Sequence, residues 1–454
     1  MKTTPATATK PRVPPELALL LLLALVVRVG VLCFMPGALV DDPDGYRALA
    51  RNLVEHGTFG EGDRPTAFRP LLYPLALVPC VALGEPQATW AIGALHVAWG
   101  LATVALAWWI ARRCGLGRCA WVAGALVACD PILLNQSTLV MTETLAALLV
   151  AVALACLVRL AERPGVFRAA TAGAALGLCG LCRPELLLWA ALCAAALLLC
   201  WRAMQEPRRA RHEADAPAPS LTVGARSNLV GPRFSSTAAF VAAVAMALLP
   251  WTIRNQLQFG RPIVATTHGG YTLLLANNPA FYEHLCHGEW GSIWDARDLG
   301  PVWGGKAHHA DPADELAADR RAYAEAWANI RGEPGRFAYS CVMRIGRFWA
   351  LAPRQGSPAI RWIVGAWYLA VFLLAAVGAW RGLRGRFDNG IWLWATLLTA
   401  AMTGVHAVYW SDPRMRGPLM IVITYSAAAA IAGWSKQRKK NRTAHGSSSA
   451  CERK

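Results

Sequence analysis

Three carboxylates, Asp41, Asp42 and Asp44, follow directly after the first apolar segment of the chain. A carboxylate at that place could act as a general base on a hydroxyl group, or it could bind a divalent cation. Ionisable groups next to hydrocarbon are costly, so they tend to mark functional sites. The simpler interpretation is that Asp42 caps a helix with Pro43 at its first position. One cap needs only one side chain, however, and three acids stand here.

A fourth acid and four arginines stand at or near the ends of later apolar segments. Glu143 either complements the dipole at a helix N-terminus or joins the first three acids in a site, and both interpretations stay open. Any one of the arginines could extend along the membrane interface to reach water. Several arginines converging on one face would instead clamp a phosphate group through paired hydrogen bonds. These arginines are Arg69, Arg183, Arg254 and Arg414.

The acids are followed by a segment with helical periodicity. Apolar residues recur at three- and four-residue intervals between Tyr46 and Val54, which predicts an amphipathic helix on a membrane surface. The sequence Arg69-Pro-Leu-Leu-Tyr73-Pro then stiffens the end of the loop. Acids at the bilayer edge, mounted on a surface helix, indicate chemistry at a membrane face.

Composition identifies the class of protein. The 454 residues are 55% hydrophobic and 16% charged, with a mean hydropathy of +0.34, which predicts an all-α polytopic membrane protein. The formal charge of +17 could suggest a nucleic-acid partner. Most basic residues, however, lie in short connectors between apolar segments, where they serve as orientation signals. We therefore expect membrane lipids, and no nucleic acid, as partners.

The apolar segments predict about ten transmembrane helices with both termini in the cytoplasm. Residues 36–87 would then form an outer loop, in which 71–84 makes a partial or interfacial helix. The predicted spans begin at Leu17 and continue at about 88–111, 119–134, 141–160, 169–182, 185–201, 234–251, 359–380, 390–410 and 416–434.

Three parts follow from this topology: an N-terminal membrane module 1–251, a hydrophilic outer domain 252–358 and a C-terminal membrane part 359–454. The first part contains a catalytic outer loop, 36–87, and a cytoplasmic linker, 202–233. We expect the outer domain to be mixed but mainly helical, with two helices separated at residues 332–335.

Loop residues of the outer domain suit a sugar-contacting surface, although ordinary turn chemistry explains many of them as well. His268 and Asn277 are the candidates there. Whether Cys286 pairs with Cys341 stays open, because no spacing pattern supports the bond. Cys179 and Cys182 form a CxxC inside an apolar helix, where packing is the expected role.

The chain resembles the bacterial branch of the polyprenyl-phosphate-dependent glycosyltransferases of the C-type fold, which includes protein O-mannosyltransferases and lipid A aminoarabinose transferases. The likeness rests on the order of several short motifs along residues 16–434. These are Asp42 four residues before Tyr46, His56-Gly57-x-Phe59, Arg69-Pro-x-x-Tyr73-Pro74, Met141-Thr-Glu143, Arg183-Pro184-Glu185, Pro250-Trp-x-x-Arg254-Asn255, Gly269-Gly270, Asn277-Asn278-Pro279 and Arg414-Met-Arg416. Pro43 stands where some members have a second acid, so Asp41 or Asp44 would replace it.

The resemblance implies an inverting transferase in a bacterial cytoplasmic membrane, with a periplasmic active site and a role in the cell envelope such as lipopolysaccharide glycosylation. Its donor would be a sugar on polyprenyl phosphate, and its acceptor a lipid, a glycan or a protein. Asp42 would be the general base, and Glu143 would orient the acceptor or hold an ion. Arg69, Arg183, Arg254 and Arg414 would bind the donor phosphate, and Tyr46, Tyr73, His268 and Asn277 the substrates. No cofactor is certain, and a divalent metal ion on Asp42 and Glu143 stays open.

Two other function classes are compatible with many apolar helices. A lipid or solute transporter or flippase would more often show two related halves and interrupted helices at the membrane midplane. A non-catalytic assembly factor could keep the fold without the chemistry. The clustering of ionisable residues at one membrane face favours the transferase.

Overall fold

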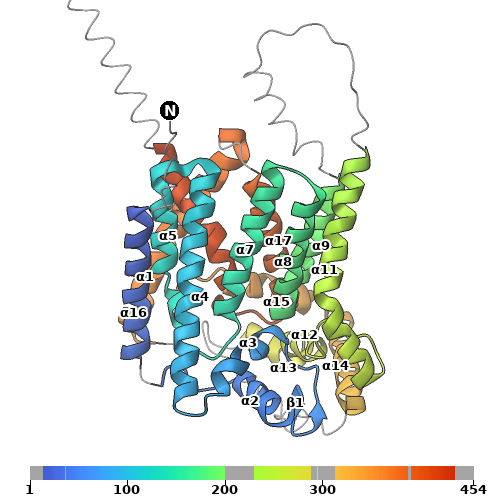
Figure 1. Cartoon of the computed structure of the whole chain (residues 1–454). Coiled ribbons are helices and arrows are strands. Elements are labelled where there is room, and N and C mark those ends of the chain that lie inside the picture. Colours follow the sequence, from blue (N-terminus) through green and yellow to red (C-terminus); the bar gives the residue numbers. More distant parts are fainter. Residues whose placement is uncertain are drawn as a thin grey trace, which may run out of the picture.

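The computed structural model describes residues 14–35, 37–199, 230–287, 294, 312–354, 356–386 and 390–434. These residues form a bundle of long helices with a group of short elements at one end (Figure 1). Residues 202–229 of the predicted linker, and the polar group His308, His309 and Asp311, lie outside the described ranges. Residues 230–233 belong to a helix rather than to the linker.

Every predicted span coincides with a helix, which confirms the all-α polytopic membrane fold. Within the described ranges, seven segments are long and apolar enough to cross a membrane, and one of them, Gln87–Ala128, doubles back at residues 112–119 and so supplies two helices. Two shorter apolar helices complete the bundle. In order, the helices are α1 (Pro15–Phe34), α4 (Gln87–Ala111), α5 (Ala120–Ala128), α7 (Glu143–Glu162), α8 (Val166–Cys182), α9 (Leu186–Leu199), α11 (Val230–Phe259), α16 (Pro358–Arg381), α17 (Ile391–Val408) and a last segment, Pro413–Trp434.

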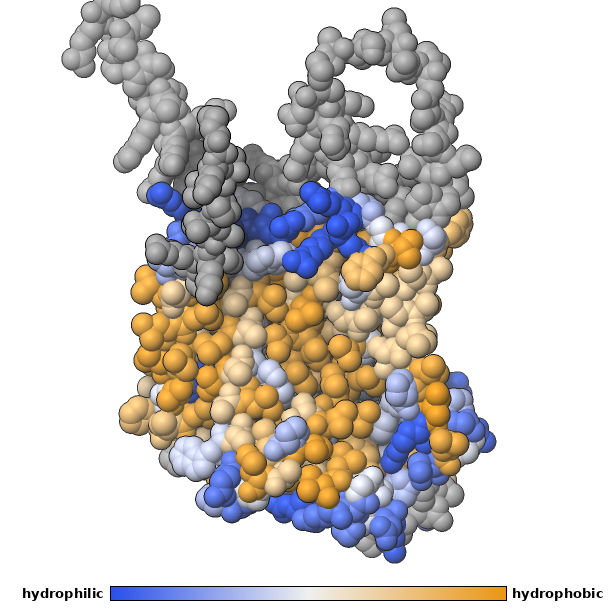
Figure 2. Space-filling view, viewed as in Figure 1, coloured by the Kyte–Doolittle hydropathy of each residue, from blue (hydrophilic) through white to orange (hydrophobic). Residues whose placement is uncertain are grey.

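The surface agrees with this assignment. Figure 2 shows a broad band of hydrophobic residues across the face of the bundle in view, with hydrophilic residues toward both ends. One predicted span differs, because α5 ends at Ala128 and a separate short helix, α6 (Pro131–Gln136), follows. Asp130 causes the break, since its Oδ1 accepts a hydrogen bond from the backbone N–H of Leu133 and caps α6 (3.0 Å).

We call the end of the bundle that carries the short elements the loop end. The partial helix predicted at 71–84 is α3, and the helix break predicted at 332–335 separates α14 from α15 at Glu333. The loop-end elements are α2 (Tyr46–His56), the hairpin β1 (Gly60–Glu61) and β2 (Arg64–Pro65), α3 (Leu72–Val81), α12 (Gly269–Ala276), α13 (Pro279–His287), α14 (Pro312–Gly332) and α15 (Pro334–Phe348).

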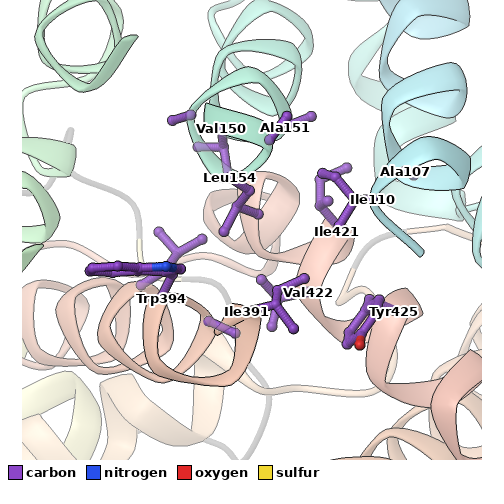
Figure 3. Close-up of a cluster of buried hydrophobic side chains, with 14 of the residues drawn as sticks. Ala107, Ile110, Val150, Ala151, Leu154, Ile391, Trp394, Ile421, Val422 and Tyr425 are labelled. Atoms are coloured by element: carbon purple, nitrogen blue, oxygen red, sulfur yellow. The ribbon is translucent and has the colours of Figure 1, made fainter. Parts of the chain in front are cut away.

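The last segment lies at the centre of the bundle. Its apolar window is 83% buried, against 17% for both α1 and α16, which face outward. Figure 3 shows Ile421, Val422 and Tyr425 of this segment beside Leu154 of α7 and Trp394 of α17. Without water to drive helices together inside a bilayer, such close packing has to supply much of the association energy.

The cysteines take no part in covalent links among the described residues. Cys286 and Cys341 are both free thiols, the first exposed and the second half-buried. Cys179 and Cys182 are free and buried on α8, as expected for packing positions.

Two helices of the loop end approach each other at Gly269 and Gly270. A Cβ atom on Gly270 would lie 2.2 Å from the backbone oxygen of Asp319 on α14, and one on Gly269 would lie 2.0 Å from the Tyr323 hydroxyl. The glycine pair is thus required where α12 packs on α14, and the same pair leads into the loop that carries His268.

We predict that Gly270→Ala separates α12 from α14 and destabilises the fold by about 1–3 kcal/mol, the usual cost of overpacking. Gly346→Ala on α15 is the matched control, because no atom lies within 4 Å of its Cβ position. Thermal midpoints of the purified proteins in detergent should fall for the first variant and stay unchanged or rise for the second. Equal midpoints would contradict the close approach.

Candidate active site

The carboxylate of Asp42 is held at the start of α2. Its Oδ2 accepts a hydrogen bond from the backbone N–H of Ala48 (2.9 Å), in the first turn of the helix. The helix begins at Tyr46 and not at Pro43 as expected, because Gly45 adopts a left-handed conformation (φ 73°) that turns the chain. Asp42 therefore caps the helix by reaching forward. Its Oδ1 is buried and has no hydrogen-bond partner among the described residues.

The two neighbouring acids have different surroundings. Asp41 is exposed, whereas Asp44 is half-buried and forms an ion pair with Arg69 (Oδ1 to Nη2, 2.9 Å). The Arg69 guanidinium also lies over the Tyr46 and Phe68 rings, 5.7 and 5.3 Å from their centroids. Asp44 and Arg69 therefore neutralise each other at the loop end, and the roles first predicted for them stay predictions.

A second charged group surrounds Glu143, which is 2% exposed. Its Oε1 lies 3.2 Å from Nη1 of Arg183 and 4.0 Å from Nε of Arg414. Arg183 also bonds Glu185 through its Nε and is itself 8% exposed. Two of the four predicted arginines thus converge on one acid. The Oε2 of Glu143 is buried without a hydrogen-bond partner.

Tyr46 and Tyr73 connect these charged groups. Their rings pack edge to face, with centroids 5.3 Å apart. Burial raises the pKa of Tyr46, which also senses the charges of Arg69, Asp44, Glu143 and Arg183. Burial likewise raises the pKa of Tyr73, and the charges of Glu143 and Asp42 raise it further. Five charged side chains therefore act on this one pair of aromatic rings.

His96 completes this arrangement and was missed by the sequence analysis. It is fully buried on α4, where its Nδ1 donates to the backbone oxygen of Ser137 (3.0 Å) and its Nε2 accepts from the Tyr73 hydroxyl (2.9 Å). A single histidine inside an apolar helix gives no indication of a partner far along the chain. Its contacts fix the orientation of Tyr73.

Arg254 anchors a loop instead of lying open to a phosphate. Its Nη1 donates to the backbone oxygen of Thr66 (2.8 Å) and to Asn255, and its Nη2 donates to the backbone oxygen of Phe59 (2.9 Å). Its guanidinium also lies 5.0 Å from the centroid of the Trp251 ring. Its terminal nitrogens therefore already bond two backbone oxygens and one side chain, which leaves fewer donors for a phosphate, and its donor-binding role stays a prediction.

The same loop is held from the opposite side by Glu315 of α14. This buried carboxylate accepts hydrogen bonds from the Thr66 hydroxyl (2.7 Å), from the Ala67 backbone N–H (2.9 Å) and from the Thr267 hydroxyl. The backbone N–H of Thr267 in turn donates to the oxygen of Ala67 (3.0 Å). Residues 66 and 67, just before Arg69, are therefore fixed by three separate parts of the chain.

Asn277 and Arg416 serve the packing of the loop end. Asn277 is fully buried, and its side-chain nitrogen donates to the backbone oxygens of Leu273 (2.7 Å) and Val408 (2.9 Å). Its role as a substrate contact stays a prediction, and its bonds in this structure are to the protein itself. Arg416 is 1% exposed and donates to the oxygen of Phe348 at the end of α15 (2.8 Å). His268 remains half-buried beside Phe68.

The acids do not form a metal centre by themselves. Asp42 and Glu143 each have one unpartnered carboxylate oxygen, which would suit a divalent cation. Yet no group of three or more His, Cys, Asp or Glu side chains could hold a metal ion in the described parts of the chain.

Comparison with known proteins bears on this geometry. Residues 82–258 match the family described as dolichyl-phosphate-mannose-protein mannosyltransferase. The oligosaccharyltransferase of Archaeoglobus fulgidus, in complex with zinc and sulfate, superimposes with a TM-score of 0.52 at 15% identity, over 93% of this chain and 49% of that one. The chain has the C-type glycosyltransferase fold.

Two further solved structures are similar to this chain. AglB from Archaeoglobus fulgidus, with an inhibitory peptide and a dolichol-phosphate, gives a TM-score of 0.50 at 14% identity, over 95% of this chain and 52% of that one. The chain spans about half the length of these archaeal proteins. ArnT from Cupriavidus metallidurans, bound to undecaprenyl phosphate, aligns with 91% of this chain over 77% of the ArnT chain. The identity is 14% and the TM-score is 0.39. No curated protein matches the sequence.

We predict that Glu315→Ala releases the loop before Arg69, because the hydroxyls of Thr66 and Thr267 and the N–H of Ala67 lose their acceptor. Each unsatisfied buried donor costs about 1–3 kcal/mol. Hydrogen exchange of residues 57–71 should accelerate in this variant and stay unchanged in Glu325→Ala, which removes an exposed acid from the same helix. Similar exchange in both variants would show that Glu315 does not hold the loop.

Proposed function

We propose that the protein transfers a sugar from a polyprenyl-phosphate carrier to an acceptor at the loop end of the bundle. The match to a mannosyltransferase family and the C-type fold support the reaction class. The observation that carries the proposal is the carboxylate of Asp42, which has one oxygen fixed by a helix N–H and the other without a partner. Asp42 lies close enough to Tyr73 for its charge, like that of Glu143, to raise the pKa of the tyrosine.

Asp42 acts as the general base in this proposal. Its Oδ1 accepts the proton of the acceptor while the acceptor atom attacks the anomeric carbon from the side opposite the phosphate. The bond from that carbon to the phosphate oxygen breaks, and its electron pair stays on the phosphate. The configuration is inverted in one displacement. No second carboxylic acid is required, because a lipid phosphate leaves as an anion.

Arg414 is our candidate for binding the departing phosphate. It is 33% exposed, whereas Arg183 is 8% exposed and already engaged by Glu143 and Glu185. Arg183 therefore holds Glu143 in place, and Arg414 retains hydrogen-bond donors for a ligand. A preorganised cation beside the leaving group is the largest contribution that such a site can make to the rate.

We place this site on the periplasmic face of a bacterial inner membrane. The opposite end of the bundle carries Arg112 and Arg113 after α4, and Arg159 and Arg163 at the end of α7. Basic connectors of this kind stay in the cytoplasm. The acceptor is a lipid, a glycan or a protein, and the sugar is a hexose or a pentose.

We predict that Asp42→Asn lowers transfer of a radiolabelled sugar from polyprenyl phosphate by about 10²–10⁴-fold, the usual contribution of a general base. The asparagine oxygen can still accept the Ala48 N–H, so the melting temperature should hold. Asp63→Asn, an exposed acid in the same loop, is the control and should retain activity. If Asp41→Asn abolished transfer while Asp42→Asn did not, the base would have been assigned to the wrong residue.

Arg414→Ala should weaken binding of undecaprenyl phosphate by about 10–100-fold, the value of one or two hydrogen bonds to a charged group. The matched control is Arg261→Ala, which removes an exposed arginine beyond the end of α11. Binding can be measured by titrating the lipid into protein held in nanodiscs. A similar loss in both variants would leave only general electrostatic attraction.

A further inference from the structure

Three aromatic rings from two distant segments gather beside the pair formed by Arg69 and Asp44. The Phe68 and His268 rings meet at right angles, with centroids 4.5 Å apart. The centroid of the Tyr271 ring lies 5.2 Å from that of His268 and 6.1 Å from that of Phe68. We call Phe68, His268 and Tyr271 the aromatic wall. The Arg69 guanidinium, 5.3 Å from the centroid of the Phe68 ring, joins the wall to the candidate active site.

The wall differs from the other aromatic residues of this site in its exposure. Tyr46 and Tyr73 are 5% and 0% exposed and belong to the core, whereas all three residues of the wall are half-buried. Burial together with the charge of Arg69 lowers the pKa of His268 to about 3. Its ring is therefore uncharged at neutral pH and presents an aromatic surface.

The backbone beneath the wall is rigid. Phe68 follows residues 66 and 67, which Glu315 and Arg254 hold in place. His268 follows Thr267, whose hydroxyl bonds Glu315, and the N–H of Gly270 donates to Asp319 (2.7 Å). Partly exposed rings on a fixed support cost little conformational entropy when a ligand binds, so the arrangement is suited to recognition.

We propose that the sugar ring of the donor stacks against the aromatic wall. This inference rests on the proposed function. One face of a sugar ring carries C–H groups, which pack favourably on the electron-rich face of an aromatic ring, while the hydroxyl groups stay free for water and polar partners. The wall would thus select a sugar ring that has an apolar face. Polar groups elsewhere would then distinguish one such sugar from another.

The donor is the substrate that can reach the wall while its phosphate lies near Arg414. The charges of Glu143 and Arg183 act on Tyr46, and Arg69 covers the Tyr46 ring and contacts Phe68 in turn. Tyr46 and Arg69 therefore connect the phosphate-binding candidates to the wall.

The test compares two ligands that differ only in the sugar. Undecaprenyl phosphate, without a sugar and with one of a panel of hexoses and pentoses, is titrated into the full-length protein in nanodiscs without acceptor. We expect wild type to prefer at least one sugar-bearing lipid to the bare lipid. Phe68→Leu and His268→Gln should then weaken binding of that lipid by about three- to tenfold, the value of one aromatic stacking contact, and change binding of the bare lipid by less than about twofold.

Tyr339→Leu is the control, because this tyrosine is 45% exposed on α15 and away from the wall. It should leave the binding of both lipids unchanged. Equal weakening of both lipids by Phe68→Leu would overturn the proposal, since a purely structural role affects the whole site. If wild type bound every sugar-bearing lipid no better than the bare lipid, stacking would be excluded while the proposed function stood. If no lipid bound at all, the proposed function would fail and the wall with it.

Discussion

The buried carboxylate of Glu315 is the contact on which the geometry of the loop end depends. A carboxylate removed from water is stable only when its oxygens find donors, and Glu315 finds them on Thr66, Ala67 and Thr267. These residues come from two loops about 200 positions apart, so satisfying one buried charge forces the loops together. Arg69 and Phe68 follow directly after the first loop segment, and His268 after the second. The position of the candidate site is therefore a consequence of an electrostatic requirement outside it.

The charged residues beside the membrane divide into those that hold the structure and those that remain available to a ligand. Arg254 and Arg416 donate to backbone oxygens, Arg69 neutralises Asp44, and Arg183 lies between Glu143 and Glu185. Each of these contacts compensates for the cost of keeping an ion away from water. Arg414 is less committed, since its contact with Glu143 is 4.0 Å long and a third of its side chain is exposed. Availability, more than the presence of an arginine, separates a ligand-binding residue from a structural one.

This division explains how far the sequence could lead. Apolar length and basic connectors are local properties, so the helices, the partial helix α3 and the break between α14 and α15 could all be predicted. Asp130-Pro131 is a local helix-stop signal as well, and this stop divides the predicted span 119–134 after α5. The sequence could not distinguish the role of Arg254 from that of Arg414, because each arginine stands at one end of an apolar segment. Their difference arises from partners about 190 and 270 residues away. The roles of His96 and Glu315 could not be predicted for the same reason, because their hydrogen-bond partners are also distant in the sequence.

The two interpretations of Asp42 turn out to be compatible. A capping carboxylate needs one oxygen for the helix N–H, and Oδ2 serves Ala48. The cap fixes the side chain, and so directs the second oxygen, Oδ1, which has no partner of its own. A general base needs a free lone pair in a fixed orientation, because proton transfer depends on geometry before it depends on basicity. The helix start thus supplies the rigidity that an isolated aspartate in a loop would lack. The left-handed turn at Gly45 allows one residue to meet both requirements, since it delays the helix long enough for Asp42 to reach forward.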